Sequence, residues 1–207
     1  MTASVSKTNL HQIVRDRVQP LVRVLDAAGF SPTFLTFVGL FLNFGAAAIV
    51  WKRHLFWGGL AYLVASAFDM LDGALARRQN RVSLLGAFLD STFDRLSETA
   101  LFLALLHDLR ISEYNLPWLP ELLLLALAGS LITSYARARA EGLGGECKVG
   151  WLERPERIVL LSVGLMLGRT ATGFVIFALC ILTWVTVVQR IAYVARTLGR
   201  PEEGGPA

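Results

Sequence analysis

Six apolar runs follow one another along the chain, separated by short polar stretches. They cover residues 34–50, 55–75, 84–106, 116–136, 158–167 and 171–194. Runs of about 20 apolar residues are long enough to cross a bilayer as helices. The fifth run is short, and Arg154, Glu156 and Arg157 crowd its start. We expect this helix to extend back toward Gly150, with those charges facing the interior. The pattern predicts an all-α integral membrane protein with six transmembrane helices.

A different pattern precedes the first run. Residues 8–28 carry apolar positions at helical spacing with charges between them, which predicts an N-terminal amphipathic helix on the cytoplasmic membrane surface. A helix packed on the bundle fits equally well, and both can hold. Gly29 ends this helix, and Ser31-Pro32 starts the next with a cap and a first-turn proline. We therefore divide the chain into a juxtamembrane helix (1–30), a six-helix domain (31–198) and a polar tail that we expect to be disordered (199–207).

The positive charges are distributed unevenly between the two ends of the predicted spans. Fifteen Lys and Arg residues fall on the side that holds both termini, and four fall on the other side. This asymmetry predicts that the termini are cytoplasmic in a cell or inner membrane. The basic balance then reflects orientation and contact with anionic lipid headgroups. No nucleic-acid-binding motif is present, so we expect no nucleic-acid partner.

Four aspartates stand at the cytoplasmic ends of the second and third runs. Asp69 and Asp72 are three residues apart, and Asp90 and Asp94 are four apart, so each pair shares one helix face. Charge at membrane depth is costly, which makes such a cluster a candidate functional site. Four carboxylates in one pocket would repel one another without cations. Their oxygens suit Mg²⁺ or Mn²⁺, and four are enough to bridge two ions. The alternative is solvated helix-end charges or salt bridges between helices.

Small residues accompany the acids. Gly73 and Ala76 fall near the Asp69 face and leave space for a bulky ligand to approach the backbone. Arg77 lies on the same face, and its planar fork suits a phosphate oxygen. Ser83 and Gly86 share the face of the second acid pair.

The full spacing, D-x2-D-G-x2-A-R-x8-G-x3-D-x3-D, resembles the signature of the CDP-alcohol phosphotransferase family, and every fixed position is present. The resemblance implies that an acceptor hydroxyl attacks the β-phosphorus of a CDP-linked lipid and that CMP leaves. It implies that the four acids hold two Mg²⁺ ions, with Mn²⁺ as the alternative, and that Asp94 is the catalytic general base. It also implies a homodimer.

The resemblance extends to the nucleotide. Residues 31–36, Ser-Pro-Thr-Phe-Leu-Thr, resemble the segment that helps members of the family to hold cytidine, although the family usually has Asn or Asp where Thr33 stands. A plain helix cap is the alternative for this segment, and also for Ser83. The residues expected to bind the CDP-lipid are Thr33, Thr36, Gly73, Ala76, Arg77 and Ser83.

Three arginines from separate helices are expected at the depth of the acids: Arg137, Arg154 and Arg190. They are either scattered side chains that extend to the interface or a convergent pocket for an acceptor phosphate. Residues 135–141 and 153–157 resemble the phosphatidylinositol phosphate synthase branch of the family, in which a basic triad binds inositol phosphate. Its first member is often Lys, where this chain has Arg137. Arg137 could also simply pair with Glu141, and Arg157 competes with Arg154 for the inward position, for which we favour Arg154.

The interpretation is therefore a membrane enzyme that acts on a CDP-diacylglycerol-type lipid, bacterial or archaeal, with inositol phosphate as the acceptor. Glycerol 3-phosphate is the alternative acceptor. A divalent-cation transporter is the rival class, but it predicts acids spread through the membrane depth rather than gathered at one end. Beyond the acids on the third helix we expect an ion pair between Arg95 and Glu98.

Overall fold

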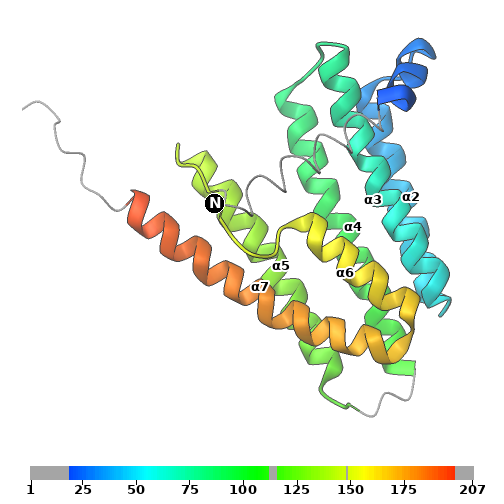
Figure 1. Ribbon diagram of the computed structural model, residues 1–207, viewed down its shortest axis with the longest axis vertical. Helices are drawn as coiled ribbons and strands as arrows, with labels where there is room; N and C mark the ends of the chain where they lie inside the picture. The colour runs from blue at the N-terminus through cyan, green and yellow to red at the C-terminus, as the bar shows by residue number, and fades with distance from the viewer. Residues whose placement is uncertain (1–18, 112–115, 148, 199–207) are drawn as a thin grey trace, which may run out of the picture.

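The computed structural model describes residues 19–111, 116–147 and 149–198, and no strand occurs within these three stretches. A short helix at 19–27 comes first. Six longer helices follow (Figure 1): α2 (Pro32–Trp51), α3 (Leu55–Arg78), α4 (Leu84–Ile111), α5 (Leu119–Gly142), α6 (Arg154–Leu167) and α7 (Arg169–Leu198). Residues 8–18 of the predicted amphipathic helix and the predicted disordered tail at 199–207 lie outside the described residues.

Each of the six apolar runs is confirmed as a helix. The start of the fifth was predicted wrongly, because α6 begins at Arg154 and does not extend back to Gly150. Glu153 is extended (φ −78°, ψ 175°), and Pro155 occupies the first turn, where its missing N–H costs nothing. Gly150 has φ +131°, which a helix cannot include.

The helices form a closed ring. In the order α2, α3, α6, α7, α5 and α4, each helix packs against the next, and α4 returns to α2. Inside the ring lies an apolar cluster that includes Tyr62, Leu105, Leu123, Leu165 and Ile176. Since α3 and α4 pack on α2 rather than closely on each other, their side chains can meet inside the ring.

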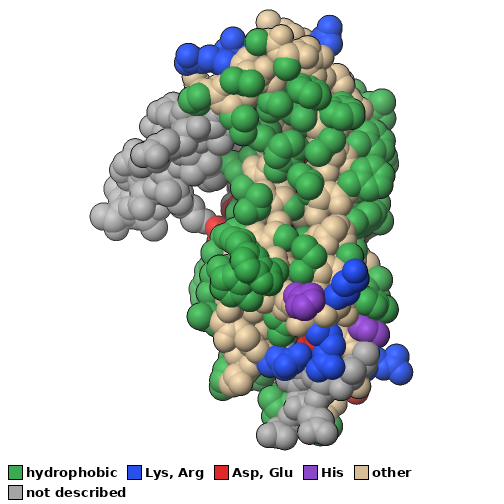
Figure 2. All heavy atoms as spheres, turned by 90° about the vertical axis from the view of Figure 1, so that its right-hand side faces the viewer, with side chains coloured by type: hydrophobic (Ala, Val, Ile, Leu, Met, Phe, Trp, Pro, Cys, Tyr) green, Lys and Arg blue, Asp and Glu red, His purple; other side chains and the backbone are tan. Residues whose placement is uncertain are grey.

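Four helices, α2, α3, α5 and α7, are long and apolar enough to cross a membrane. The other two of the six long helices, α4 and α6, fall short of that standard. The first half of α4 carries charged residues, and the 14 residues of α6 span only about 21 Å. Figure 2 shows apolar side chains along the length of one face of the molecule, with Lys, Arg and His side chains near its ends.

The helix at 19–27 packs on the bundle. Val22 is only 4% exposed and packs with Leu35, Leu71 and Leu75. Asp26 accepts hydrogen bonds from Arg78 and Gln79 (2.8 and 3.0 Å). These bonds lower the pKa of the Asp26 carboxyl. On the other face, Leu21 and Val24 are exposed, so a membrane contact there stays a prediction.

The turn between this helix and α2 has the glycine and the serine cap that the sequence predicts. Gly29 has φ +77°, a conformation that favours glycine, and the helix ends there. Ser31 then caps α2, and its side-chain oxygen accepts from the backbone N–H of Phe34 at 3.2 Å.

Candidate active site

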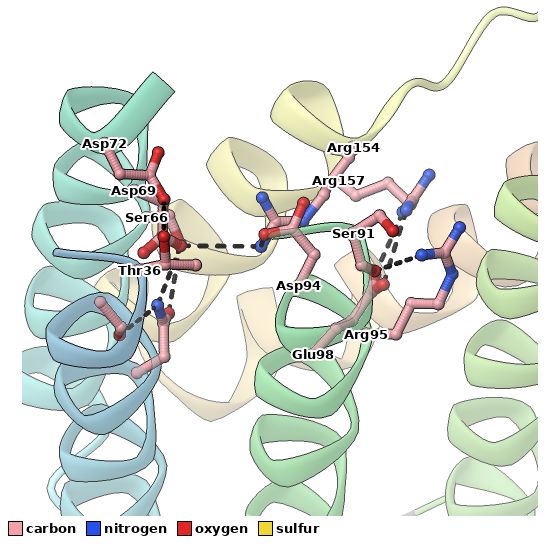
Figure 3. A network of polar contacts seen from close by, with 12 residues as sticks. Thr36, Ser66, Asp69, Asp72, Ser91, Asp94, Arg95, Glu98, Arg154 and Arg157 are labelled. Atoms are coloured by element: carbon pink, nitrogen blue, oxygen red, sulfur yellow. Dashed lines mark hydrogen bonds and ion pairs between the residues drawn. The ribbon is translucent and has the colours of Figure 1, made fainter. Parts of the chain in front are cut away.

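The four aspartates lie on two helices that flank α2. Asp69 and Asp72 belong to the last turns of α3, while Asp90 and Asp94 belong to the first turns of α4. In Figure 3, Asp69 and Asp94 lie on either side of the Arg154 guanidinium. The acids therefore face a shared region of the ring interior and are gathered at one end of the bundle, contrary to what a transporter pathway predicts.

Two polar residues of α2 hold the acids of α3. Thr36 donates to Oδ2 of Asp72 at 2.6 Å, and Asn43 donates to Oδ2 of Asp69 at 3.1 Å. Gly39 lies between them, where a Cβ atom would stand only 2.0 Å from Oδ1 of Asp69. Thr36, Gly39 and Asn43 are spaced as one helix face, so α2 is shaped to receive both carboxylates.

Asn43 and Gly39 were not identified from the sequence. The available signal was a single asparagine in the middle of the run at 34–50. A fully buried polar side chain at that depth needs a partner, and the partner here is an acid of the cluster.

A guanidinium lies between the two acid-bearing helices. Nη2 of Arg154, from the first turn of α6, is 2.8 Å from Oδ1 of Asp94 and 3.8 Å from Oδ2 of Asp69 (Figure 3). Within the described part of the chain, Nε and Nη2 of Arg154 are buried and make no hydrogen bond. The arginine thus supplies charge to the acids through Nη2, while its buried Nε is a donor without an acceptor, which an oxyanion could satisfy.

The acids have the right chemistry for a hard divalent cation, because all of their donor atoms are carboxylate oxygens. One guanidinium cannot balance four carboxylates, so further positive charge fits this region. In the described residues, no three Asp, Glu, His or Cys side chains are already drawn together as ligands. Binding a metal there would require the carboxylates to turn toward it.

A cavity of about 570 Å³ opens beside the acids. Its lining combines two of the aspartates with all three arginines expected to bind the acceptor: Asp90, Asp94, Arg137, Arg154 and Arg190. These side chains come from four different helices, α4, α5, α6 and α7. The structure therefore brings the arginines together in one pocket, as opposed to leaving them scattered at the interface.

Each arginine is held in a different way. Arg190 donates from Nε to the carbonyl of Val149 at 2.9 Å and from Nη1 to that of Thr133 at 2.7 Å. Gly150 lies against this side chain: a Cβ there would stand 3.4 Å from Nε of Arg190 and 2.5 Å from Cγ2 of Thr186. Arg137 forms the simple i, i+4 pair with Glu141 at 2.9 Å, and that pair is half-exposed.

The expected ion pair between Arg95 and Glu98 is wrong. Glu98 pairs instead with Arg157 of α6 (3.1 Å), while Arg95 donates to the carbonyls of Ser91 and Ser134 (Figure 3). All three nitrogens of Arg157 are engaged, by Glu98 and by the carbonyl of Leu152. Arg157 also borders the cavity, and among its described contacts each guanidinium nitrogen has an acceptor, whereas Nε and Nη2 of Arg154 make no hydrogen bond.

The residues expected to bind the nucleotide lie apart from this cavity, and none belongs to its described lining. Thr33 and Ser83 are exposed, and Ser83 caps α4 by accepting from the N–H of Gly86 at 3.0 Å. The side chain of Arg77 folds back over Gly73, whose Cβ position is 3.5 Å from Nη1. Of this group, Thr36 and Gly73 contact the acids, since the Thr36 hydroxyl and the Gly73 backbone N–H both donate to Asp72.

Residues 30–198 match the CDP-alcohol phosphatidyltransferase family. The archaetidylinositol phosphate synthase of Pyrococcus horikoshii is 33% identical over 183 residues, which cover 86% of this chain and 93% of that protein. The crystal structure of Mycobacterium tuberculosis phosphatidylinositol phosphate synthase with CDP-DAG bound has a TM-score of 0.82 at 30% identity and covers 91% of this chain and 98% of its own. A structure of the mycobacterial enzyme in complex with manganese and citrate has a TM-score of 0.81 at 30% identity and covers 92% and 93%.

Proposed function

This chain belongs to the CDP-alcohol phosphatidyltransferase family, and we propose that it transfers the phosphatidyl group of CDP-diacylglycerol to inositol phosphate, which gives phosphatidylinositol phosphate and CMP. It is a multi-pass helical membrane protein of phospholipid biosynthesis. The observation that carries the proposal is the cavity in which Arg137, Arg154 and Arg190 surround a space next to Asp94. Three cations suit an acceptor that bears a phosphate, and they offer little to a neutral alcohol.

Divalent metal supports the reaction, and we assign its ligands to Asp69, Asp72, Asp90 and Asp94. The manganese-bound relative supports a divalent cation, and we propose two Mg²⁺ ions, which Mn²⁺ can replace. When bound, the metal neutralises the diphosphate of the donor and the charge that develops on it. Asn43 and Thr36 orient two of the ligands from α2. Hydrogen bonds of this kind hold a ligating carboxylate in the orientation that a metal ion requires.

Asp94 is assigned as the general base. It lines the acceptor cavity, so a hydroxyl of the bound acceptor can reach its carboxylate. The proton of that hydroxyl passes to Asp94 while the oxygen forms a bond to the β-phosphorus. The bond from this phosphorus to the CMP oxygen breaks, and CMP leaves. Arg154 holds the Asp94 carboxylate in place through their 2.8 Å contact and presents its remaining donors to the acceptor phosphate.

The nucleotide end of the donor is assigned to the α3 side of the acids. Gly73 and Ala76 leave the backbone accessible, and Arg77 is exposed at the end of α3, where it can reach a diphosphate oxygen. Thr33, Thr36 and Ser83 complete this assignment from the starts of α2 and α4. The lipid tails remain in the bilayer.

The proposed placement has α4 and α6 crossing the membrane together with the four more apolar helices. The distribution of Lys and Arg supports cytoplasmic termini and a cytoplasmic active site in the cell membrane. A homodimer is proposed on the family resemblance.

The test is a transfer assay with radiolabelled CDP-diacylglycerol and purified protein. Inositol phosphate should give a labelled lipid phosphate and CMP, chelator should stop the reaction, and Mg²⁺ or Mn²⁺ should restore it. Glycerol 3-phosphate is the competing acceptor, and CDP-archaeol is the competing donor, which the archaeal relative makes worth testing. Equal use of free inositol would overturn the phosphate pocket, and metal flux without CMP release would overturn the enzyme.

A further inference from the structure

The buried ion pair in the wall of the cavity has no part in the proposed chemistry. Glu98 of α4 and Arg157 of α6 are each only 4% exposed. Arg157 donates from Nε to Oε1 of Glu98 at 3.1 Å, and Ser130 of α5 donates to the same oxygen at 2.7 Å. One carboxylate thus joins three helices.

This pair lies one helical turn from the candidate active site. Asp94 and Glu98 are four residues apart on α4, and Arg154 and Arg157 are three apart on α6. The two ion pairs, Asp94 with Arg154 and Glu98 with Arg157, therefore form parallel rungs between the same two helices (Figure 3). Because each helix is rigid over one turn, the position of the Glu98–Arg157 pair fixes where Arg154 lies relative to Asp94.

The backbones of α4 and α6 do not pack closely. In the ring, α6 is packed on α3 and α7, so its link to α4 is made by long side chains. α6 is also the shortest of the six helices. The two ion pairs are therefore direct side-chain links that limit how far α6 slides or turns relative to α4 at this end of the bundle.

Stability alone does not explain this buried pair, because well-packed apolar residues would serve equally well or better. The best-attested use of such a pair is to fix the register of two elements. We propose that Glu98 and Arg157 are positioning residues, which set the register of α6 against α4 so that Arg154 reaches both Asp94 and the acceptor phosphate. This inference rests on the proposed function, in which Arg154 contacts that phosphate.

The test compares Arg157→Gln, Arg157→Lys and the double variant Glu98→Met/Arg157→Met. The double variant removes the pair without leaving a buried unpaired charge, so the protein keeps its fold while the register is lost. We expect KM for inositol phosphate to rise on the order of 10- to 100-fold in both the double variant and Arg157→Gln. KM for the CDP-lipid should change little, and Arg157→Lys should recover part of the loss.

Two further measurements separate positioning from general loosening. Hydrogen exchange should quicken in the first turns of α6 in Arg157→Gln and stay unchanged in α3. Ser130→Ala is the matched control: it removes a bond to the same carboxylate without touching the α4–α6 link, so exchange in α6 should stay at the wild-type rate.

A double variant with wild-type KM for the acceptor and wild-type exchange in α6 would overturn the positioning role. Arg154→Gln separates this outcome from failure of the proposed function. If that change leaves KM for inositol phosphate unaltered, the assignment of Arg154 to the phosphate is wrong. The exchange data then still report whether the buried pair holds α6.

Discussion

At the scale of single residues, the proposed chemistry depends most on Asp94. Asp94→Asn keeps the size of the side chain and removes both its charge and its capacity to accept a proton. We expect the rate of transfer to fall about 10²- to 10⁴-fold, because that is the usual contribution of a general base. CDP-lipid binding, measured by titration, should largely persist. Near-normal turnover in this variant would refute the base assignment.

Gly39 offers a second test at this scale, because it governs the approach of Asp69 to α2. In Gly39→Ala the new Cβ would lie 2.0 Å from Oδ1 of Asp69, so the carboxylate must move. We expect Mn²⁺ affinity to fall about 10- to 100-fold, the usual effect of disturbing the support of a metal ligand. Electron paramagnetic resonance of added Mn²⁺ measures this affinity directly.

Gly45→Ala is the matched control on the same helix. A Cβ at Gly45 has nothing within 4 Å, so only helix propensity changes, by about 1 kcal/mol in favour of the variant. Mn²⁺ affinity should stay at the wild-type value. Equal losses in the two variants would show that α2 as a whole, and not the contact with Asp69, determines metal binding.

Among the elements, the helix at 19–27 packs on the bundle by one face. Val22 is buried against Leu35 and Leu75, whereas Val24 is 64% exposed. Removing two methyl groups from a buried site should cost about 1–2 kcal/mol, and the same change at an exposed site should cost almost nothing. We therefore expect Val22→Ala to lower the thermal stability of the detergent-solubilised protein and to speed proteolysis before α2. Val24→Ala should do neither.

The polar side of this docking has a defined pH dependence. Hydrogen bonds from Arg78 and Gln79 lower the pKa of Asp26 from its ordinary 3.8, so the ion pair contributes above that value. The contribution is lost only as pH falls through the lowered pKa. Protection of residues 19–27 from proteolysis should therefore be constant from about pH 5 to about pH 8. Loss of protection within that range would mean that another titrating group controls the docking.

The elements also show what a sequence reveals and what it conceals. Apolar runs predicted the helices well, and α7 extends only a few residues beyond its run at 171–194 because polar last turns remain helical outside the apolar stretch. The start of α6 was missed because Pro155 was not weighed as a first-turn residue. The acids were predicted because their spacing lies within single helices. Their partners on α2, and the pairing of Glu98 with Arg157 59 positions away, depend on which helix faces meet. No pattern along one helix encodes that choice.

At the scale of the whole molecule, the candidate active site and a second buried charged contact lie at opposite ends of the closed ring of helices. The acids, the cavity and the arginines share one end, and a large apolar cluster packs the helices together inside the ring. At the opposite end, Asp108 of α4 is fully buried, and Arg53 and Arg169 approach its Oδ1 within 3.4 and 3.5 Å. This carboxylate links the turn between α2 and α3 to the first residue of α7.

Asp108→Asn tests that separation. The change removes the buried charge on which both half-exposed guanidiniums converge, and loss of such contacts to a charged group costs about 1.5–3 kcal/mol. Asp108 is about 21 Å along α4 from Asp94, so KM for both substrates should remain as in the wild type. Thermal unfolding and steady-state kinetics on one preparation measure the two effects together. Glu141→Gln, which breaks the exposed pair with Arg137, should cost less than about 1 kcal/mol of stability. If Asp108→Asn raised KM for the acceptor without loss of stability, the two ends would be coupled and the ring would not act as a rigid support.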